Sequence, residues 1–224
     1  MKLSSNTTMV LKNFATINQN LVIKEGSELL TMSSMKNIVA KATVEENFPK
    51  EIAIYDLNEF LASLSIFKSP VLEFEEQYLT IKEEDQPHKK LTYFYSDPSV
   101  VQSPTKTITM PSEEVKFHLD MNKLLEMKRA AGVIGSPDMV LQKSSGNSSL
   151  LVKDKKNDTA NNYSSDIKTD GDGEYKFFFK VENLKLFDGD YDVKISSKNI
   201  SHFKNDKSNI EYWIALEPES TYSA

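Results

Sequence analysis

Short apolar stretches alternate with polar ones along the chain, and three of these stretches share one pattern. Residues 53–64 read AIYDLNEFLASL, residues 117–128 read FHLDMNKLLEMK and, more faintly, residues 179–190 read FKVENLKLFDGD. Each begins with a short alternating run, continues through an acid or amide, and ends in a compact apolar stripe. A repeated unit of this kind predicts a repeated architecture.

The first half of the chain predicts two helices among several strands. Residues 6–18 predict the first helix, which Ser5 or Asn6 can cap. Its apolar face comprises Val10, Leu11, Phe14 and Ile17. Asp56 followed by Glu59 has the spacing of a capping box, which predicts a second helix over 57–67. Two hairpins are predicted at 21–32 and 71–84, and single strands at 36–44, 51–55 and 90–96.

The second half repeats this order after a change in composition. Residues 97–114 hold three prolines and no periodic signal, so they predict an extended linker. A strand then leads to Asp120, which caps a predicted helix from Met121 to about Ala131, ended by Gly132 or Gly135. A hairpin at 139–154 is followed by a polar segment, 154–174, with one weak strand. The remaining elements are strands at 174–181, 191–196 and 210–217 and a short helix at 183–187. The sequence therefore predicts an α+β chain with two pseudo-equivalent domains.

Composition and charge exclude several classes of protein. The 224 residues carry a formal net charge of −6, which disfavours a chain that binds nucleic acid over its whole surface. The sequence has no Cys, which excludes a disulfide framework and fits a reducing cytoplasm. The amino terminus has no long apolar run, so no signal peptide is expected. No run of 18 apolar residues occurs anywhere, so no membrane span is expected either.

Motifs for catalysis and for metal binding are also missing. There is no phosphate-binding loop and no nucleophile elbow, so the sequence does not indicate an enzyme. Asp170, Asp172 and Glu174 imitate the start of a calcium loop, but Tyr175 stands where the loop needs Gly and Val181 where it needs Glu. The three histidines lack metal-ligand spacing. No cofactor or metal is therefore expected.

The two ends of the chain and its first strand-to-helix unit resemble the sliding clamps of T-even-type bacteriophages. The resemblance lies in KLSSNTTMVLKNFATIN at residues 2–18, in AIYDLNEFLASLS at 53–65 and in YWIALEPEST at 212–221. Between about 140 and 175 only the pattern matches. The wider superfamily includes proliferating cell nuclear antigen and the bacterial polymerase β subunit.

The resemblance implies a fold, an assembly and a set of partners. Two clamp domains, at 1–97 and 115–224, would flank a connector at 98–114. Three chains would form a closed ring with a β-sheet exterior and helices lining the hole. Such a homotrimer would encircle duplex DNA, without sequence preference, and tether the replicative DNA polymerase in the host cytoplasm. An ATP-dependent clamp loader and late-transcription factors are further implied partners, whereas no membrane is.

A ring of this kind needs a positively charged inner wall. A helical wheel shows which bases lie on the polar face of each predicted helix. Lys12 lies opposite the apolar face of the first helix and Lys123 lies opposite Met121, Leu124 and Leu125 of its counterpart. The predicted DNA-facing bases are Lys12, Lys123, Lys128, Arg129 and Lys185. Ideal geometry places Lys128 within the apolar stripe, and the helix at 57–67 departs from the expectation, because its outer face carries Glu59. Each of these bases can also be ordinary solvated surface.

The resemblance also implies a groove beside the connector that captures short apolar peptides of partner proteins. The predicted pocket residues are Val100, Val101, Pro104, Ile108, Met110, Trp213, Ile214, Leu216 and Pro218. Because adjacent strand residues face opposite ways, Trp213 or Ile214 can equally belong to the core.

The expected subunit contact is a pairing of edge strands, since a closed ring leaves no edge exposed. Residues 90–96 of one chain would meet a strand from 154–170 of the next. Two alternatives stay open from the sequence. One is a non-enzymatic, β-rich structural phage protein, and the other is a carbohydrate- or calcium-binding β module.

Overall fold

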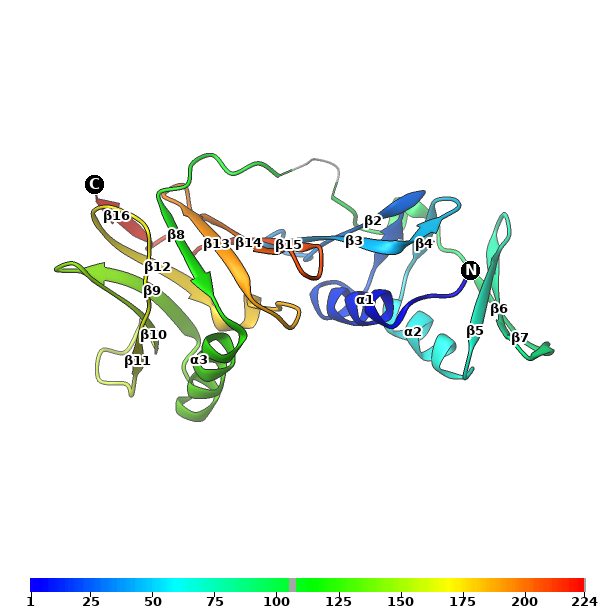
Figure 1. Cartoon of the computed structure of the whole chain (residues 1–224), viewed down its shortest axis with the longest axis horizontal. Helices are drawn as coiled ribbons and strands as arrows, with labels where there is room; N and C mark the ends of the chain where they lie inside the picture. Colours follow the sequence, from blue (N-terminus) through cyan, green and yellow to red (C-terminus); the bar gives the residue numbers. More distant parts are fainter. Residues whose placement is uncertain (105–107, 224) are drawn as a thin grey trace. The chain divides into compact units, whose positions relative to one another are not determined.

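The computed structural model describes residues 1–104 and 108–223, and it divides into two compact units, Met1–Thr107 and Ile108–Ala224. Figure 1 shows that helices and antiparallel strands occur in both. The predicted α+β class with a repeated unit is confirmed. Within the described residues, none of the helices has the length and apolar character that crossing a membrane requires.

Over residues 1–104, the first unit packs two helices beside seven strands. The helices α1 (Ser5–Ile17) and α2 (Leu57–Ser65) contact each other, and α1 also packs on β3. The strands are β1 (Leu21–Ile23), β2 (Gly26–Met32), β3 (Ile38–Phe48), β4 (Ile52–Ile54), β5 (Pro70–Phe74), β6 (Tyr78–Glu83) and β7 (Gln86–Phe94). They pair antiparallel as β1–β4, β2–β3 and β5–β6–β7. A 3-10 turn at Pro98–Val100 follows.

The second unit packs one helix, α3 (Met121–Ile134), against a five-stranded sheet with the order β11-β10-β9-β12-β16. The strands β8 (Val115–Leu119), β13 (Tyr191–Ser196), β14 (Ile200–Asn205) and β15 (Ile210–Ala215) pair in the order β8–β13–β14–β15. The strands of the five-stranded sheet are β9 (Asp138–Ser144), β10 (Asn147–Lys153), β11 (Tyr163–Asp166), β12 (Glu174–Lys180) and β16 (Thr221–Ser223).

The strand-to-helix repeat is present in both units and uses the same cap. The Asp56 carboxylate accepts the N–H groups of Asn58 and Glu59 at 2.9 and 3.1 Å, and Asp120 accepts that of Lys123 at 2.8 Å. Each acid occupies the N-cap of its helix and satisfies donors that have no partner inside the helix. Gly135, with φ 67° in the left-handed region, ends α3. Of the two glycines predicted to end this helix, Gly135 is therefore the correct one.

Two predicted elements are wrong. Residues 21–32 do not form a hairpin, because β1 pairs with β4 and β2 pairs with β3. All three residues of β1 and all three of β4 are buried, so each strand needs cover on both faces. The helix at 183–187 is absent as well, since a 3-10 turn spans only Val181–Asn183. Leu184 and Leu186 are buried on either side of half-exposed Lys185, which is the alternation of extended chain.

The first helix is held at its start by a carboxylate from β3. Its cap is Ser4, one residue before the predicted choices, and Ser4 Oγ accepts the N–H of Thr7 at 3.1 Å. Glu46 lies beside this turn and accepts hydrogen bonds from the Ser4 N–H and the Thr7 hydroxyl. Burial disfavours the charged form of Glu46, but these hydrogen bonds outweigh it and lower the pKa of the carboxyl below its ordinary value.

Glu46→Gln is expected to destabilise the protein by about 1 kcal/mol at pH 7, because it weakens the anchoring of α1. Since the folded-state pKa of Glu46 is lowered from 4.5, its contribution is present above pH 4.5 and is lost as the pH falls through the folded-state value. Urea unfolding followed by circular dichroism should therefore separate wild type from the variant at pH 7, and the gap should narrow as the pH falls below 4.5. A gap that stays the same as the pH falls would contradict this role.

Candidate functional site

The first helix exposes one base among small polar side chains. Lys12 is exposed on α1, on the side opposite buried Val10, Phe14 and Ile17, as predicted. Met9 is exposed one turn earlier on the same helix. No carboxylate pairs with Lys12 among the described residues, so its charge is available to a negatively charged ligand.

The three bases of α3 differ in their surroundings. Lys123 is half-buried and pairs with Glu126 at 3.2 Å. Lys128 is also half-buried, where burial lowers the pKa of its ammonium group and the nearby Asp188 carboxylate partly offsets that shift. Arg129 is exposed, and no carboxylate pairs with it in the part of the chain that the structure describes.

Two predictions about this site are wrong: the burial of Leu125 on α3 and the position of Lys185 on a helix. The helix buries Leu124, Met127 and Ala131, whereas Leu125 is exposed. These buried positions are spaced three and four residues apart, and Leu125 falls beside their stripe. Lys185 follows the 3-10 turn in extended chain, so it does not lie on an inner helix. The DNA-facing role of each base stays a prediction.

The predicted peptide-pocket residues differ widely in exposure. Val101 packs with Val22 and Ala53 in a buried cluster of the first unit. Ile214 is fully buried in β15, while the neighbouring Trp213 stacks on His202 with 4.8 Å between ring centroids. The remaining residues are either buried (Pro104, Leu216), half-buried (Ile108, Met110) or exposed (Val100, Pro218). The pocket stays a prediction.

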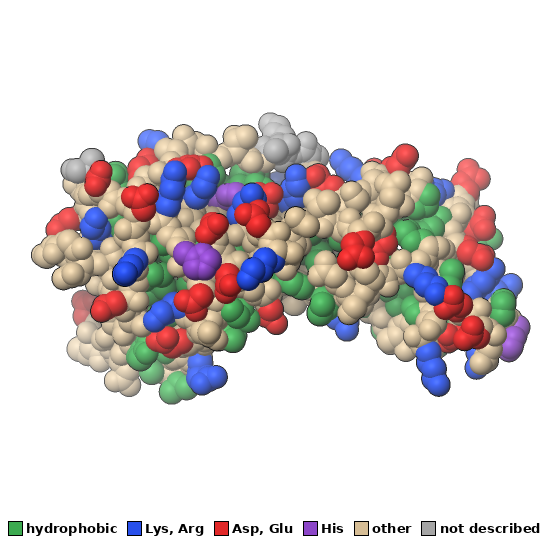
Figure 2. All heavy atoms as spheres, in the orientation of Figure 1, with side chains coloured by type: hydrophobic (Ala, Val, Ile, Leu, Met, Phe, Trp, Pro, Cys, Tyr) green, Lys and Arg blue, Asp and Glu red, His purple; other side chains and the backbone are tan. Residues whose placement is uncertain are grey.

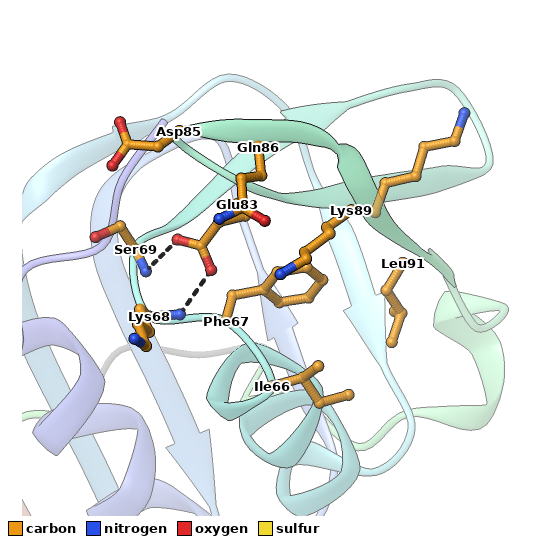
Figure 3. Close-up of a pocket in the computed structure, with 10 residues that line it drawn as sticks. Ile66, Phe67, Lys68, Ser69, Glu83, Asp85, Gln86, Lys89 and Leu91 are labelled. Atoms are coloured by element: carbon orange, nitrogen blue, oxygen red, sulfur yellow. Dashed lines mark hydrogen bonds between the residues drawn. The ribbon is translucent and has the colours of Figure 1, made fainter.

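The outer strand of the three-stranded sheet carries positive charge. Strand β7 contains Lys89 and Lys90 and no acid, and it is the last strand of its sheet. Beside it lies a cavity of about 630 Å³ with Ile66, Phe67 and Leu91 in its wall (Figure 3). The Glu83 carboxylate closes one side of the cavity, where it accepts the N–H groups of Lys68 and Ser69 at 2.9 and 2.8 Å.

A second cavity, of about 510 Å³, lies between α2 and the same strand, and it is acidic and aromatic. Its wall includes Asp56 at the N-cap of the helix, Glu59 within the helix and Tyr93 of the strand, whose ring packs edge-on against Phe60. Burial raises the pKa of Tyr93 to about 12, and the carboxylates of Glu59 and Asp56 add to this rise. Glu59 has no ion-pair partner within residues 1–104 and 108–223, so this cavity suits a cationic side chain.

The outer strand of the five-stranded sheet adjoins an apolar groove on α3. The groove has a volume of about 500 Å³ and is lined by Leu125, Val133 and Ile134 of the helix and by Tyr163 of β11. The Tyr163 hydroxyl donates to the Glu126 carboxylate at 2.7 Å, which lowers the pKa of Glu126 and raises that of Tyr163. Val133 is 81% exposed, so the groove is open to solvent.

Acidic and basic side chains are interspersed elsewhere on the surface. Figure 2 shows this mixture over the visible face of both units. On β8 and β13, for example, His118 lies 3.0 Å from Asp192, and Lys194 of β13 pairs at 2.7 Å with Glu113, which precedes β8. A mixed surface of this kind does not attract DNA strongly.

Sequence reasoning placed Phe94 and Tyr163 in the two segments expected to pair, 90–96 and 154–170, but it missed the groove and the cavities beside them. Phe94 is 68% exposed at the end of β7, and Leu125, Val133 and Tyr163 line the groove on α3. Exposed apolar residues beside an outer strand were the available signal, because such a surface favours association.

The two units match known families separately. Residues 2–101 match the family model of a DNA polymerase processivity factor, and residues 116–218 match that of the C-terminal part of the gp45 sliding clamp. The sliding clamp of Vibrio phage KVP40 is 33% identical over 97% of this chain and 99% of its own length. The chain belongs to the sliding-clamp family. The sliding clamp of Enterobacteria phage T4 is 29% identical, over 99% of both chains.

Solved structures support the clamp fold at much lower identity. Proliferating Cellular Nuclear Antigen from Entamoeba histolytica superposes with a TM-score of 0.68 at 12% identity, over 96% of this chain and 97% of the other. The PCNA2–PCNA3 complex from Sulfolobus tokodaii gives the same TM-score and identity, over 96% of both chains. The predicted clamp fold is thereby confirmed, and the protein is a non-enzymatic processivity factor for DNA polymerase. The predicted bounds at 1–97, 98–114 and 115–224 stay predictions.

Proposed function

We propose that three copies of this sliding clamp form a closed ring around duplex DNA and tether the replicative polymerase in the host cytoplasm. The observation that supports the ring best is the pair of outer strands, β7 in one unit and β11 in the other. Both are last in their sheets, and each exposes an aromatic residue, Phe94 or Tyr163. Pairing β7 of one copy with β11 of the next would satisfy both edges.

The charges of the two strands favour this pairing. Strand β7 carries Lys89 and Lys90 and no acid, whereas β11 carries Asp166 and no base. Opposite charges across an interface favour the correct pairing, and like charges oppose the pairing of two identical edges. A head-to-tail contact of this kind closes into a ring when the rotation between subunits allows it.

Among the predicted DNA-facing bases, Lys12 is the strongest candidate, since it is exposed and has no carboxylate beside it. Lys123 and Lys128 lie near carboxylates, Lys185 lies outside the helices and Arg129 lines the apolar groove. A few weak, salt-dependent phosphate contacts suffice, because a closed ring retains DNA by its topology. The ring needs an ATP-dependent loader to open it, and late-transcription factors remain proposed partners from the family resemblance.

The topological mechanism predicts a difference between circular and linear DNA. With loader, ATP and the polymerase of the same virus, the clamp is expected to lengthen synthesis products on primed circular DNA. It should have little effect on short linear templates with open ends, from which a ring slides off. Equal stimulation of both templates would contradict encirclement and favour direct polymerase binding. No stimulation of either, from a well-folded monomer, would contradict the proposed ring.

A further inference from the structure

The two outer strands, β7 and β11, carry opposite charges. The helices beside them, α2 and α3, also carry opposite charges. Helix α2 has Glu59 as its only charged residue, while α3 carries Lys123, Lys128 and Arg129 against one acid, Glu126. The helix layer is therefore negative beside β7 and positive beside β11. The strand layer has the reverse signs, since β7 is positive and β11 is negative.

In each unit the helix lies on one particular face of its outer strand. The ring of Tyr93 on β7 packs against Phe60 of α2 at 5.3 Å, and the hydroxyl of Tyr163 on β11 reaches Glu126 of α3. If the two strands pair with both helices on the same face, the apolar groove of α3 is covered by α2 of the next copy. The opposite arrangement would leave the groove, with Val133 81% exposed, in water.

We propose that Arg129 of one copy inserts into the acidic and aromatic cavity formed by Asp56, Glu59 and Tyr93 of the next copy. Arg129 lines the groove on α3 and is the chain's only arginine, and Glu59 is exposed in the wall of the cavity. Neither side chain has an ion-pair partner among the described residues. A guanidinium group can bind a carboxylate and lie on an aromatic ring at once, which matches this cavity.

This inference rests on the proposed ring and gives Arg129 a role at the subunit contact instead of on the DNA. It also explains why the outer face of α2 carries an acid where a DNA-facing helix would carry a base. The order of the charges, negative on α2 and positive on α3, permits head-to-tail contacts and opposes contacts between two copies of the same edge.

Charge exchange tests the proposal with three variants: Glu59→Lys, Arg129→Glu and the two changes together. Native mass measured over a dilution series gives the protein concentration at which the trimer dissociates. Each single variant is expected to raise that concentration about tenfold or more, within the range of measured coupling between close interfacial charges. The double variant should return close to wild type. Lys12→Glu, an equal change of charge on α1, is the matched control and should leave assembly unchanged.

The outcomes distinguish this contact from the ring itself. If wild type forms trimers and both single variants dissociate like wild type, the Arg129 contact is wrong while the ring stands. A double variant no better than its parents also overturns the contact. If wild type stays monomeric at every concentration, the ring is wrong, and the contact with it. Melting curves that match wild type show that a variant is folded and that its dissociation reports the interface.

Discussion

Val133→Glu is expected to leave the protein folded and monomeric at concentrations where wild type is trimeric. Val133 is 81% exposed on α3, so a glutamate there meets water in the single chain. In the proposed ring the same carboxylate would be buried in the apolar groove beside Leu125 and Tyr163. Arg129, which lines the same groove, could pair with this glutamate only by leaving Glu59 of the next copy. Burying the added charge therefore costs about 3 kcal/mol per contact, which is roughly 100-fold in affinity.

The readouts are native mass over a dilution series and product length on primed circular DNA. Val133→Glu should lose both trimer formation and long products, because processivity depends on a closed ring. Met35→Glu is a matched control, since Met35 is 82% exposed in the turn between β2 and β3 and lines neither the groove on α3 nor the cavity beside α2. A Val133→Glu protein that assembles and stimulates the polymerase like wild type would remove α3 from the subunit contact.

This prediction depends on the exposed face of α3, which could be predicted only in part from the sequence. Helical periodicity placed α3 correctly, but it assigned Leu125 to the buried stripe, whereas the helix buries Leu124, Met127 and Ala131. Periodicity locates an apolar residue only to within the width of a stripe. Which residue at the margin is exposed depends on the neighbouring strand, and β11 lies in a segment with little strand character of its own.

Local signals worked where a single residue decides the structure. Asp56 and Asp120 cap their helices as expected, because a short acid before an apolar stripe satisfies donors at a helix start in any fold. The prediction failed where the structure depends on the pairing of strands that are distant in the sequence. The segment 21–32 looks like a hairpin locally, yet β1 joins β4, since three consecutive buried residues need cover from both sides.

Glu59 shows how a misfit in the sequence can point to function. An acid on α2 contradicts a positive inner wall, and the sequence offered no reason for it. The structure places that acid in the wall of a cavity with Asp56 and Tyr93, next to an outer strand. Only the arrangement of α2 beside β7 makes this visible, because the two segments are about 30 residues apart in the chain.

Asp138→Asn is expected to destabilise the second unit by about 3 kcal/mol, because it leaves the partly buried ammonium group of Lys180 without its closest partner. Asp138 has no exposed surface and begins β9. Its carboxylate lies 2.6 Å from the ammonium group of Lys180 and accepts the N–H of Lys155 at 3.1 Å.

The same network holds the C-terminal segment. The ammonium group of Lys155 pairs with Glu217 at 2.7 Å and with Glu219 at 2.9 Å, just before β16 joins β12. Loss of the Asp138 charge should therefore loosen residues 217–223 first, which hydrogen exchange can detect. Urea unfolding can follow the second unit through Trp213, the chain's only tryptophan.

Two further variants show whether the charge itself is responsible. Asp192→Asn removes an exposed carboxylate that pairs with His118, and it should cost less than 1 kcal/mol. Asp138→Asn combined with Lys180→Met should recover part of the lost stability, since a buried pair can be replaced by side chains without charge at low cost. If Asp138→Asn and Asp192→Asn unfold at the same urea concentration, the buried pair does not stabilise the unit. A double variant less stable than Asp138→Asn would mean that Lys180 is needed for contacts other than this pair, such as its approach to Glu217 at 3.9 Å.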